Sequence, residues 1–272
     1  MRKKIYLTFD DGVQEGTDEV LKVLSKNDIK ASFFLVGINC FHMYMYERDQ
    51  FNNKFQLLIN NHLICNHTFS HALEFYSSYY ENGVLINNKR ISAFRDLTFN
   101  TKFFQWLLFK MNHRKCQMDN WFFRPPGRNI LNDSDKNNLA ILLSEIYNSH
   151  PSYPIMGWDL EWNMTFELST FIREEVRKNH ESKARFNPLQ IINHTNEVLN
   201  QNVNFDRIKE KHQDVLEKIF RCPKDKIIIL LHDRAFRFHP QIDFSEELDS
   251  LINKLKFLGY EFETLDKYYG QK

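Results

Sequence analysis

The sequence contains few cysteines, and they form no recognisable pair. Its four cysteines, Cys40, Cys65, Cys116 and Cys222, lie far apart and include no CxxC motif. This spacing excludes a zinc ribbon and a disulfide framework as the organising feature of the fold. Scattered thiols of this kind are typical of proteins in a reducing compartment.

Long apolar runs and clusters of one charge are also absent. No stretch approaches the roughly 20 apolar residues of a membrane-spanning helix, and the start, MRKKIYLTFDDG, has no apolar segment long enough for a signal peptide. Lys and Arg total 36 against 35 for Asp and Glu, and no basic cluster suited to nucleic-acid phosphates appears. We therefore expect a cytoplasmic protein with no membrane span and no nucleic-acid partner.

What the chain does contain is short apolar runs that alternate with helical patterns. Its 272 residues, 42% of them hydrophobic, suffice for one large domain or two small ones. Alternating strands and helices indicate an α/β fold with a mostly parallel sheet, either open or closed into a barrel. The runs that predict strands lie at 5–9, 31–36, 63–66, 121–124, 155–159, 226–231 and 260–265.

Two regions interrupt this alternation. Residues 72–120 are aromatic-rich and give no clear pattern, and residues 163–225 are polar, with a helical stretch near 206–220. We interpret 163–225 as an insertion packed on the sheet, so that residues 1–272 form a single catalytic domain.

The first predicted strand ends in two adjacent carboxylates, Asp10 and Asp11. Two such groups repel each other, and one must hold its proton unless a cation lies between them. The simpler alternative is a solvated Asp-Gly turn. In a parallel sheet this position lies at the carboxyl ends of the strands, where functional residues gather.

The third predicted strand is followed by NHTFSH, which places His67 and His71 four residues apart. On one helical turn both imidazoles would project from the same face. With a carboxylate they would suit Zn²⁺ or another borderline divalent metal. Chance pairs are also expected in a chain with 11 histidines, and His62 and His194 are interpreted as ordinary residues.

Two further motifs follow predicted strands. In FFRPPGR, Arg124 is placed to hold a carboxylate, the alternative being a surface arginine in a turn. In GWDLEW, Trp158 and Trp162 flank two acids and could bind a sugar face or shield a buried acid. A strand with inward tryptophans and outward acids would give the same alternation.

The strongest predicted strand ends in a histidine, His232, within IIILLHDR. An imidazole oriented by a carboxylate is a general acid or base near neutral pH. A lone histidine after a strand is more often structural.

Taken in order, these motifs resemble the polysaccharide deacetylase family, also called the NodB homology domain. The resemblance extends from about residue 4 to 266, and TFDDG at 8–12 with HTxxH at 67–71 is its most specific part. It implies a distorted (β/α) barrel, usually with seven strands.

The resemblance also implies roles for the residues that match the family motifs. Asp10 matches the general base, and Arg124 the arginine that orients it. The metal ligands would be Asp11, His67 and His71. The metal expected is Zn²⁺, with Co²⁺ or another divalent ion as alternatives.

The substrate side is implied in the same way. Leu230 and Leu231 match an apolar wall around the acetyl methyl group, and His232 matches the general acid that protonates the leaving amine. Gly127 stands where many members have an aromatic residue, but its N–H can still contribute to an oxyanion hole.

The tryptophan motif is compressed relative to the family. Either Asp159 or Glu161 would then be the partner of His232, and Asp159 is our choice. Trp158 and Trp162 are assigned to the substrate pocket. The long insertion at 163–225 is a further departure from the family pattern.

The function implied is a metal-dependent hydrolase that removes N-acetyl groups from an N-acetylated amino sugar or polysaccharide. One alternative keeps the metal site and changes the amide: deformylation of a lipid-linked amino sugar, or hydrolysis of a cyclic imide or ureide. Another is a non-catalytic carbohydrate-binding relative. The presence of Asp10, Asp11, His67, His71 and His232 argues against a decayed site.

Overall fold

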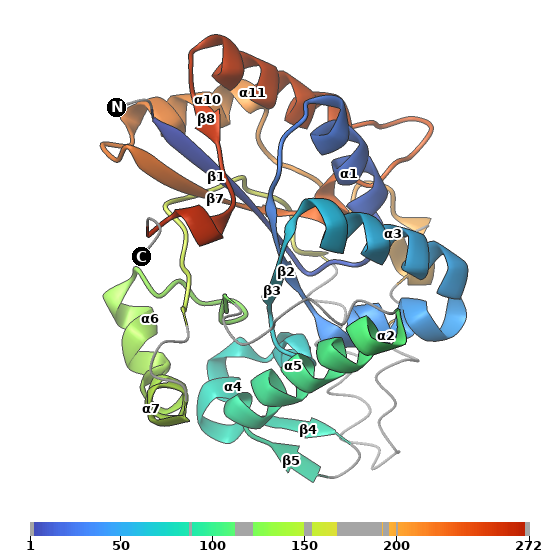
Figure 1. Ribbon diagram of the computed structural model, residues 1–272, viewed down its shortest axis with the longest axis vertical. Helices are drawn as coiled ribbons and strands as arrows, with labels where there is room; N and C mark the ends of the chain where they lie inside the picture. Colours follow the sequence, from blue (N-terminus) through green and yellow to red (C-terminus); the bar gives the residue numbers. More distant parts are fainter. Residues whose placement is uncertain are drawn as a thin grey trace.

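A parallel sheet lies at the centre of the computed structural model, with helices packed around it (Figure 1). In the described part of the chain the sheet has six strands, in the order β3-β2-β1-β7-β6, with β8 paired to β1. The structure describes residues 3–86, 89–111, 122–149, 154–167, 192, 196–199 and 201–269.

The two longest strands form the middle of the sheet. β1 (Lys4–Asp10) pairs in parallel with β7 (Lys226–His232) along its whole length, so that Asp10 lies opposite His232. On the other side of β1 come β2 (Ser32–Leu35) and β3 (Leu63–Asn66). These are the apolar runs of the sequence, and they are buried because helices cover the sheet.

The sheet curves into a distorted barrel. Asn66 is bridged to Phe123 and Phe123 to Ile155, and β6 (Leu160–Glu161) pairs with β7. The chain near 155–161 therefore closes the sheet between its two edges, which confirms the predicted α/β barrel. In the described residues of the predicted strands at 121–124 and 155–159, only Phe123 and Ile155 form bridges, and residue 121 lies outside the described part of the chain. At 121–124 the cause is Pro125 and Pro126, which have no N–H for a ladder.

Alternation along the strands separates the barrel interior from the helix-facing core. Ile5, Leu7 and Phe9 pack in the large core beneath the helices, whereas Tyr6 belongs to a second cluster on the opposite face. That inner face continues through Thr8 to Asp10, because successive side chains of a strand alternate. The strand thus delivers Asp10 to the inner rim of the barrel.

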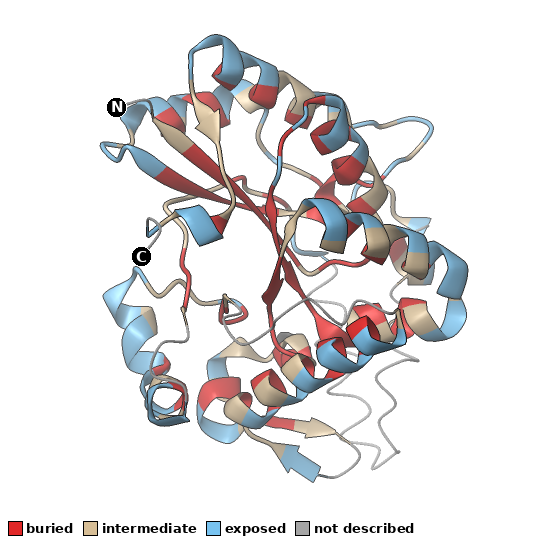
Figure 2. Ribbon diagram, viewed as in Figure 1, coloured by how far each residue is buried: buried red, intermediate tan, exposed pale blue. Residues whose placement is uncertain are grey.

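The helices are two-sided, with buried inner and exposed outer faces (Figure 2). On α11 (Ser245–Phe257), Leu248, Leu251, Ile252 and Leu255 recur at helical spacing and are buried. Within the described residues the helices are α1 (Thr17–Lys26), α2 (Gly37–Tyr46), α3 (Arg48–Asn61), α4 (Tyr76–Asn82), α5 (Ala93–Lys110), α6 (Asp133–Asn138), α7 (Ala140–Ser149), α10 (His212–Arg221) and α11 (Ser245–Phe257). The short 3₁₀ helices are η1 (His71–Glu74), η2 (Asp233–Phe236) and η3 (Leu265–Lys267).

The aromatic-rich region proves to be mainly helical. It contains η1, α4, a hairpin of β4 (Val84–Ile86) and β5 (Lys89–Ile91), and α5, while 112–121 lies outside the described residues. α5 begins where the Ser92 hydroxyl accepts a hydrogen bond from the Arg95 N–H, 3.3 Å away.

Of the predicted insertion, residues 168–191 also lie outside the described part of the chain. The described part includes α10, packed beside α11, and a short antiparallel contact of Met164 with Ile208. The last strand along the chain is β8 (Glu261–Phe262), which pairs with the start of β1. The assignment of 1–272 to one domain stays a prediction.

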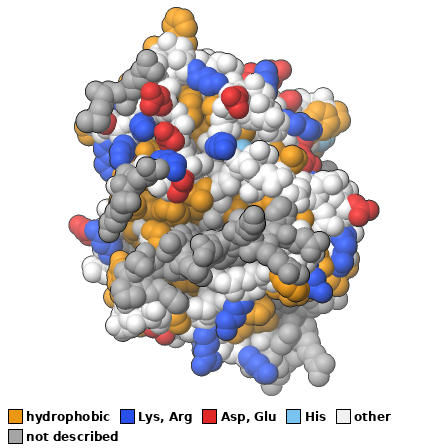
Figure 3. Space-filling model, viewed as in Figure 1, with side chains coloured by type: hydrophobic (Ala, Val, Ile, Leu, Met, Phe, Trp, Pro, Cys, Tyr) orange, Lys and Arg blue, Asp and Glu red, His pale blue; other side chains and the backbone are white. Residues whose placement is uncertain are grey.

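The molecular surface bears both charges. Basic and acidic side chains are interspersed on the face drawn in Figure 3, as expected for a net charge of +1. Over the described residues, the structure contains no helix with the length and apolar character needed to cross a membrane.

The packing of α11 gives a test of the core. Leu251 is fully buried and Phe257, on the same helix, is 83% exposed. Leu251→Ala should lower the free energy of unfolding by about 2–5 kcal/mol, because it leaves a cavity. Phe257→Ala should change it by about 0.5 kcal/mol or less. Urea denaturation measures both, and equal effects of the two substitutions would contradict this packing.

Candidate active site

The two adjacent aspartates have different backbone conformations at the end of β1. β1 ends at Asp10, and Asp11 has a φ of 78°, so the chain turns between the two residues. Aspartate tolerates this left-handed conformation better than most residues. The turn is fixed by the Asp11 N–H, which donates to the Phe34 carbonyl at 3.1 Å, and by Asn39, which donates to the Asp11 carbonyl at 2.9 Å.

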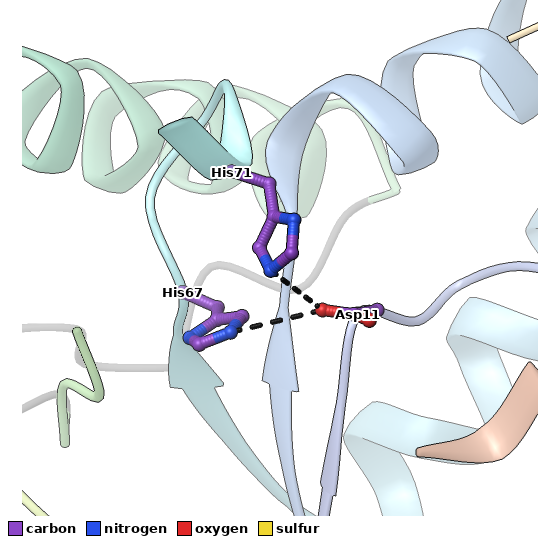
Figure 4. Close-up of side chains that lie close together, drawn as sticks. All are labelled: Asp11, His67 and His71. Carbon is purple, nitrogen blue, oxygen red and sulfur yellow. Dashed lines mark ion pairs between the residues drawn. The ribbon is translucent and has the colours of Figure 1, made fainter. Parts of the chain in front are cut away.

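Asp11, His67 and His71 converge at the carboxyl ends of β1 and β3, and their side chains point toward one another (Figure 4). One potential ligand atom from each lies within 4.8 Å of the other two. Nε2 of His71 is 3.0 Å and Nε2 of His67 is 3.7 Å from Oδ1 of Asp11. Two imidazoles and one carboxylate form a donor set that suits a divalent metal such as Zn²⁺.

The two histidines do not share a helical turn, so that detail of the prediction is wrong. Thr68 and His71 have φ values of 64° and 53°, and η1 starts only at His71. The loop is held instead by buried polar groups that the sequence analysis missed. Oδ1 of Asn66 accepts the Thr68 N–H at 2.9 Å, and the Asp96 carboxylate accepts the Ser70 hydroxyl at 2.7 Å. Asp96 lies on α5, and no local pattern connects it to this loop.

The tautomer of His67 follows from its hydrogen bond. Its Nδ1 lies 2.8 Å from the Arg124 carbonyl, which can only accept, so Nδ1 carries the proton and Nε2 is left as a lone pair. Burial is the main cause that lowers the pKa of His67 to about 4, so the ring is neutral at pH 7. Nε2 therefore faces Asp11 and also Asp10, whose Oδ2 is 3.5 Å away, without a proton of its own. A cation fits this group of unprotonated donors.

Asp11 itself is held in the ionised form. Burial alone would raise its pKa, but His71, His232 and His67 outweigh burial and lower the pKa well below the usual range of an aspartate. An ionised carboxylate is the form that ligates a metal.

Asp10 is paired with Arg124, as the sequence indicated. Nη1 of Arg124 donates to Oδ1 of Asp10 at 2.7 Å and lies 2.9 Å from the Thr8 hydroxyl, while Nη2 donates to the Gly157 carbonyl at 3.1 Å. The contact with Asp10 is thus a single hydrogen bond and not a bidentate pair.

The guanidinium of Arg124 is fully buried, and its central carbon lies 4.1 Å from the Phe34 ring centroid. Such a group, with its rotamer fixed by an aromatic ring and by Gly157, holds Asp10 in one orientation.

The choice of Asp159 as the partner of His232 is wrong. Oδ1 of Asp159 contacts Lys224 at 2.5 Å, and Oδ2 accepts the Ile228 N–H at 2.8 Å. Ile228 is four residues before His232 on an extended strand, about 13 Å away. Asp159 thus binds Lys224 and the middle of β7, and its carboxylate lies away from the rim where His232 is found.

Glu161 is the acid beside His232. It pairs in register with Leu230, two residues before His232, and lines the same cleft. Burial raises the pKa of the Glu161 carboxyl, and His232 acts against that rise, so the two side chains interact electrostatically. Nδ1 of His232 is buried and has no hydrogen-bond partner among the described residues.

These groups open into one cleft with a volume of about 480 Å³. Asp10, Asp11, His67, His71, His232 and Glu161 line it, together with Gly127, Trp158 and Leu230. Of the five residues that the sequence analysis placed on the substrate side, Gly127, Trp158 and Leu230 are therefore at the cleft.

The other two, Trp162 and Leu231, are not at the cleft, and both pack in the core. Trp162 is the clearer case. Its side chain is only 1% exposed, its Nε1 donates to the Glu210 carbonyl at 2.8 Å, and its ring packs against Phe236. Since side chains alternate in extended chain, the residue after Glu161 turns away from the cleft. Leu231 likewise packs in the helix-facing core and not in the cleft.

Gly127 is required by its surroundings. It has a φ of 63°, and a Cβ atom there would lie 2.6 Å from Cγ of Tyr76. The ring of Tyr76 thus occupies the space in which a side chain at position 127 would begin. Tyr76 also lies next to the metal site, with its hydroxyl 3.4 Å from Nδ1 of His71.

The histidines interpreted as ordinary lie apart from this group. Nδ1 of His62 accepts a hydrogen bond from the Ala31 N–H at 3.2 Å, at the opposite end of β3. His194 lies outside the described residues.

Comparison with known proteins bears on the family that the sequence motifs resemble. The model of the family described as polysaccharide deacetylase matches residues 1–93. Over its whole length the chain superimposes on the polysaccharide deacetylase Bc1974 from Bacillus cereus, with a TM-score of 0.54, 20% identity and 96% of that chain covered. The family model thus confirms the resemblance to the polysaccharide deacetylase family over residues 1–93, and the solved structure confirms the fold over the whole chain.

Matches to curated proteins are local. A peptidoglycan-N-acetylglucosamine deacetylase of Bacillus cereus is 55% identical over 38 residues, which is 14% of each chain. A chitin deacetylase of Pestalotiopsis sp is 42% identical over 66 residues, covering 24% of this chain and 21% of that one. The matched stretches thus span less than a quarter of these relatives.

The buried pair of Asp10 and Arg124 gives a stability test. Arg124→Met should cost about 3–5 kcal/mol of unfolding free energy, because it leaves a buried carboxylate unpaired. Arg128, in the same motif, is 21% exposed and 3.6 Å from Asp135, so Arg128→Met should cost about 1 kcal/mol or less.

Urea denaturation of both variants measures the difference. Adding Asp10→Asn to Arg124→Met should recover part of the loss, since the uncompensated charge is then removed. Additive losses in the double variant would show that the two side chains are not energetically coupled.

Proposed function

We propose that this protein is a metal-dependent hydrolase that removes the acetyl group from an N-acetylated amino sugar or its polymer. The observation that carries the proposal is the convergence of two sets of groups in one cleft. One set is the Asp11, His67 and His71 donor triad, and the other is Asp10 held by Arg124, with His232 across from it. The names of the relatives, a peptidoglycan-N-acetylglucosamine deacetylase and a chitin deacetylase, support the substrate class.

A divalent cation, which we propose to be Zn²⁺ with Co²⁺ as an alternative, would be held by Asp11, His67 and His71. When bound there it would act as a Lewis acid and make water more acidic. The proton on Nδ1 of His67, fixed by the Arg124 carbonyl, keeps Nε2 available as a ligand.

The protein residues supply the proton transfers. Oδ1 of Asp10 accepts the hydrogen bond from Arg124, and its Oδ2 lies 3.5 Å from Nε2 of His67. We propose that Asp10 takes a proton from the attacking water. His232 gives a proton to the departing nitrogen, and Glu161 orients and stabilises its imidazolium form. Gly127 lines the cleft, and we propose its N–H as a hydrogen-bond donor to the developing oxyanion.

Different substitutions should distinguish the residues that bind the metal from the residue that transfers the proton. Asp10→Asn should lower kcat by about 10²- to 10⁴-fold while retaining the metal, because the base is lost and the ligands remain. His67→Ala should lose the metal itself, and His62→Ala should change neither. Elemental analysis and acetate release from N-acetylglucosamine oligomers with Zn²⁺ or Co²⁺ measure these effects. Formate release should be followed in parallel on N-formyl substrates.

The metal assignment fails if His67→Ala and Asp10→Asn retain equal metal content. The deacetylase proposal fails if no acetate is released from any N-acetylated sugar with any divalent metal.

The partner of His232 can be tested with two matched acids. Glu161→Gln should lower kcat by about 10-fold or more, because an amide cannot stabilise the imidazolium of His232. Asp159→Asn should change kcat by less than about threefold and act mainly on stability, through Lys224 and the Ile228 N–H. A larger loss of kcat in Asp159→Asn would return the role to Asp159.

A further inference from the structure

A short two-stranded ribbon from the predicted insertion lies beside the cleft. Met164 is bridged in antiparallel fashion to Ile208, and the Thr165 N–H donates to the Arg207 carbonyl at 2.9 Å. The Lys209 N–H donates to the Asn163 carbonyl at 2.8 Å. The ribbon is therefore a defined piece of structure and not a loose loop.

Two buried arginines fix this ribbon to the end of β7. Arg207 and Arg237 are each 4% exposed. Arg237 follows η2, and its Nη2 donates to the carbonyls of Phe205 at 2.6 Å and Val203 at 3.2 Å. Arg207 donates to the Arg237 carbonyl in return. Since η2 follows His232 directly, these hydrogen bonds fix the position of the ribbon relative to His232, the proposed general acid.

The ribbon presents a large aromatic side chain to the cleft. Phe166 is 45% exposed and lines the cleft, and its ring lies edge-to-face with His232 at a centroid separation of 5.8 Å. Met164, on the same ribbon, is 3% exposed and lines the cleft beneath it. An exposed phenylalanine on a pinned ribbon next to an acid–base group is an apolar surface facing the substrate space.

A polar pair stands in the same wall of the cleft. Asp206, 1% exposed, and Arg234 both line it, and Nη1 of Arg234 is 3.4 Å from Oδ2 of Asp206. An aromatic ring offers a surface to the C–H face of a sugar. Asp206 is too buried to meet a ligand, so its part is to hold the Arg234 guanidinium, which also donates to Gln14 Oε1, in the wall of the cleft.

We propose that Phe166, with Arg234 in the same wall of the cleft, forms the subsite for the sugar ring that carries the leaving amine. The inference rests on the proposed function in one respect. If His232 protonates the leaving nitrogen, the sugar bonded to that nitrogen must lie next to His232, and Phe166 covers that position. The acetyl group then occupies the metal side, near Leu230, and the ribbon sets the specificity for the amine side.

The direct test is binding of the N-acetylglucosamine tetramer to the metal-free protein, measured by isothermal titration calorimetry, which needs neither metal nor turnover. Phe166→Ala should raise the Kd by roughly five- to tenfold, because one aromatic contact is lost. Phe166→Tyr, which keeps the ring, should stay within about twofold of the wild type. Phe220→Ala removes a similarly exposed phenylalanine (53%) on α10, outside the cleft, and should leave the Kd unchanged.

The outcomes separate this subsite from the deacetylase activity. An unchanged Kd in Phe166→Ala, or no binding of the tetramer by the wild type, overturns the subsite. Binding that depends on Phe166 without acetate release under any metal leaves the subsite in place and overturns the deacetylase. If acetate is released but neither Kd nor KM changes in Phe166→Ala, the deacetylase proposal stands and the subsite is overturned.

Discussion

The site depends on giving two neighbouring carboxylates different electrostatic partners. Asp10 and Asp11 follow each other at the end of β1, where two unscreened negative charges would repel. The structure turns them apart and pairs Asp10 with a buried arginine, while Asp11 faces two imidazoles. A neutral His67 with its lone pair directed at both acids completes an arrangement that a divalent cation would stabilise.

Arg124 connects the two halves of this arrangement. Its guanidinium holds Asp10, and its backbone carbonyl fixes the tautomer of His67. Both contacts come from one residue at the point where the chain leaves the sheet at Phe123. A buried arginine is costly to desolvate, and that cost is offset only because Thr8, Asp10 and Gly157 all accept hydrogen bonds from it. Asp10 and His67 are thus both positioned by Arg124.

Local patterns in the sequence were enough to predict the strands that carry the site. The apolar runs ending at Asp10, Asn66 and His232 became β1, β3 and β7, and parallel pairing brought their ends together. Leu63–Asn66 was predicted to the residue. These elements are set by buried apolar side chains, which a single sequence reveals.

The predictions that proved wrong concern features that depend on strand register or on contacts between residues far apart in the sequence. Whether Asp159 or Glu161 meets His232 is decided by the pairing of β6 with β7, and the same pairing sends Trp162 into the core. The loop between the two histidines is held by Asp96, some 26 residues further along the chain. None of these contacts leaves a signature in neighbouring residues, so only the folded structure could assign them.

The central claim is that one cation binds where these side chains converge. Anomalous diffraction from crystals grown with Zn²⁺, recorded at the zinc edge, tests it most directly. The account predicts a single strong peak about 2.0–2.2 Å from a carboxylate oxygen of Asp11 and from Nε2 of both His67 and His71. A fully occupied zinc peak elsewhere, with no density between these three side chains, would contradict it.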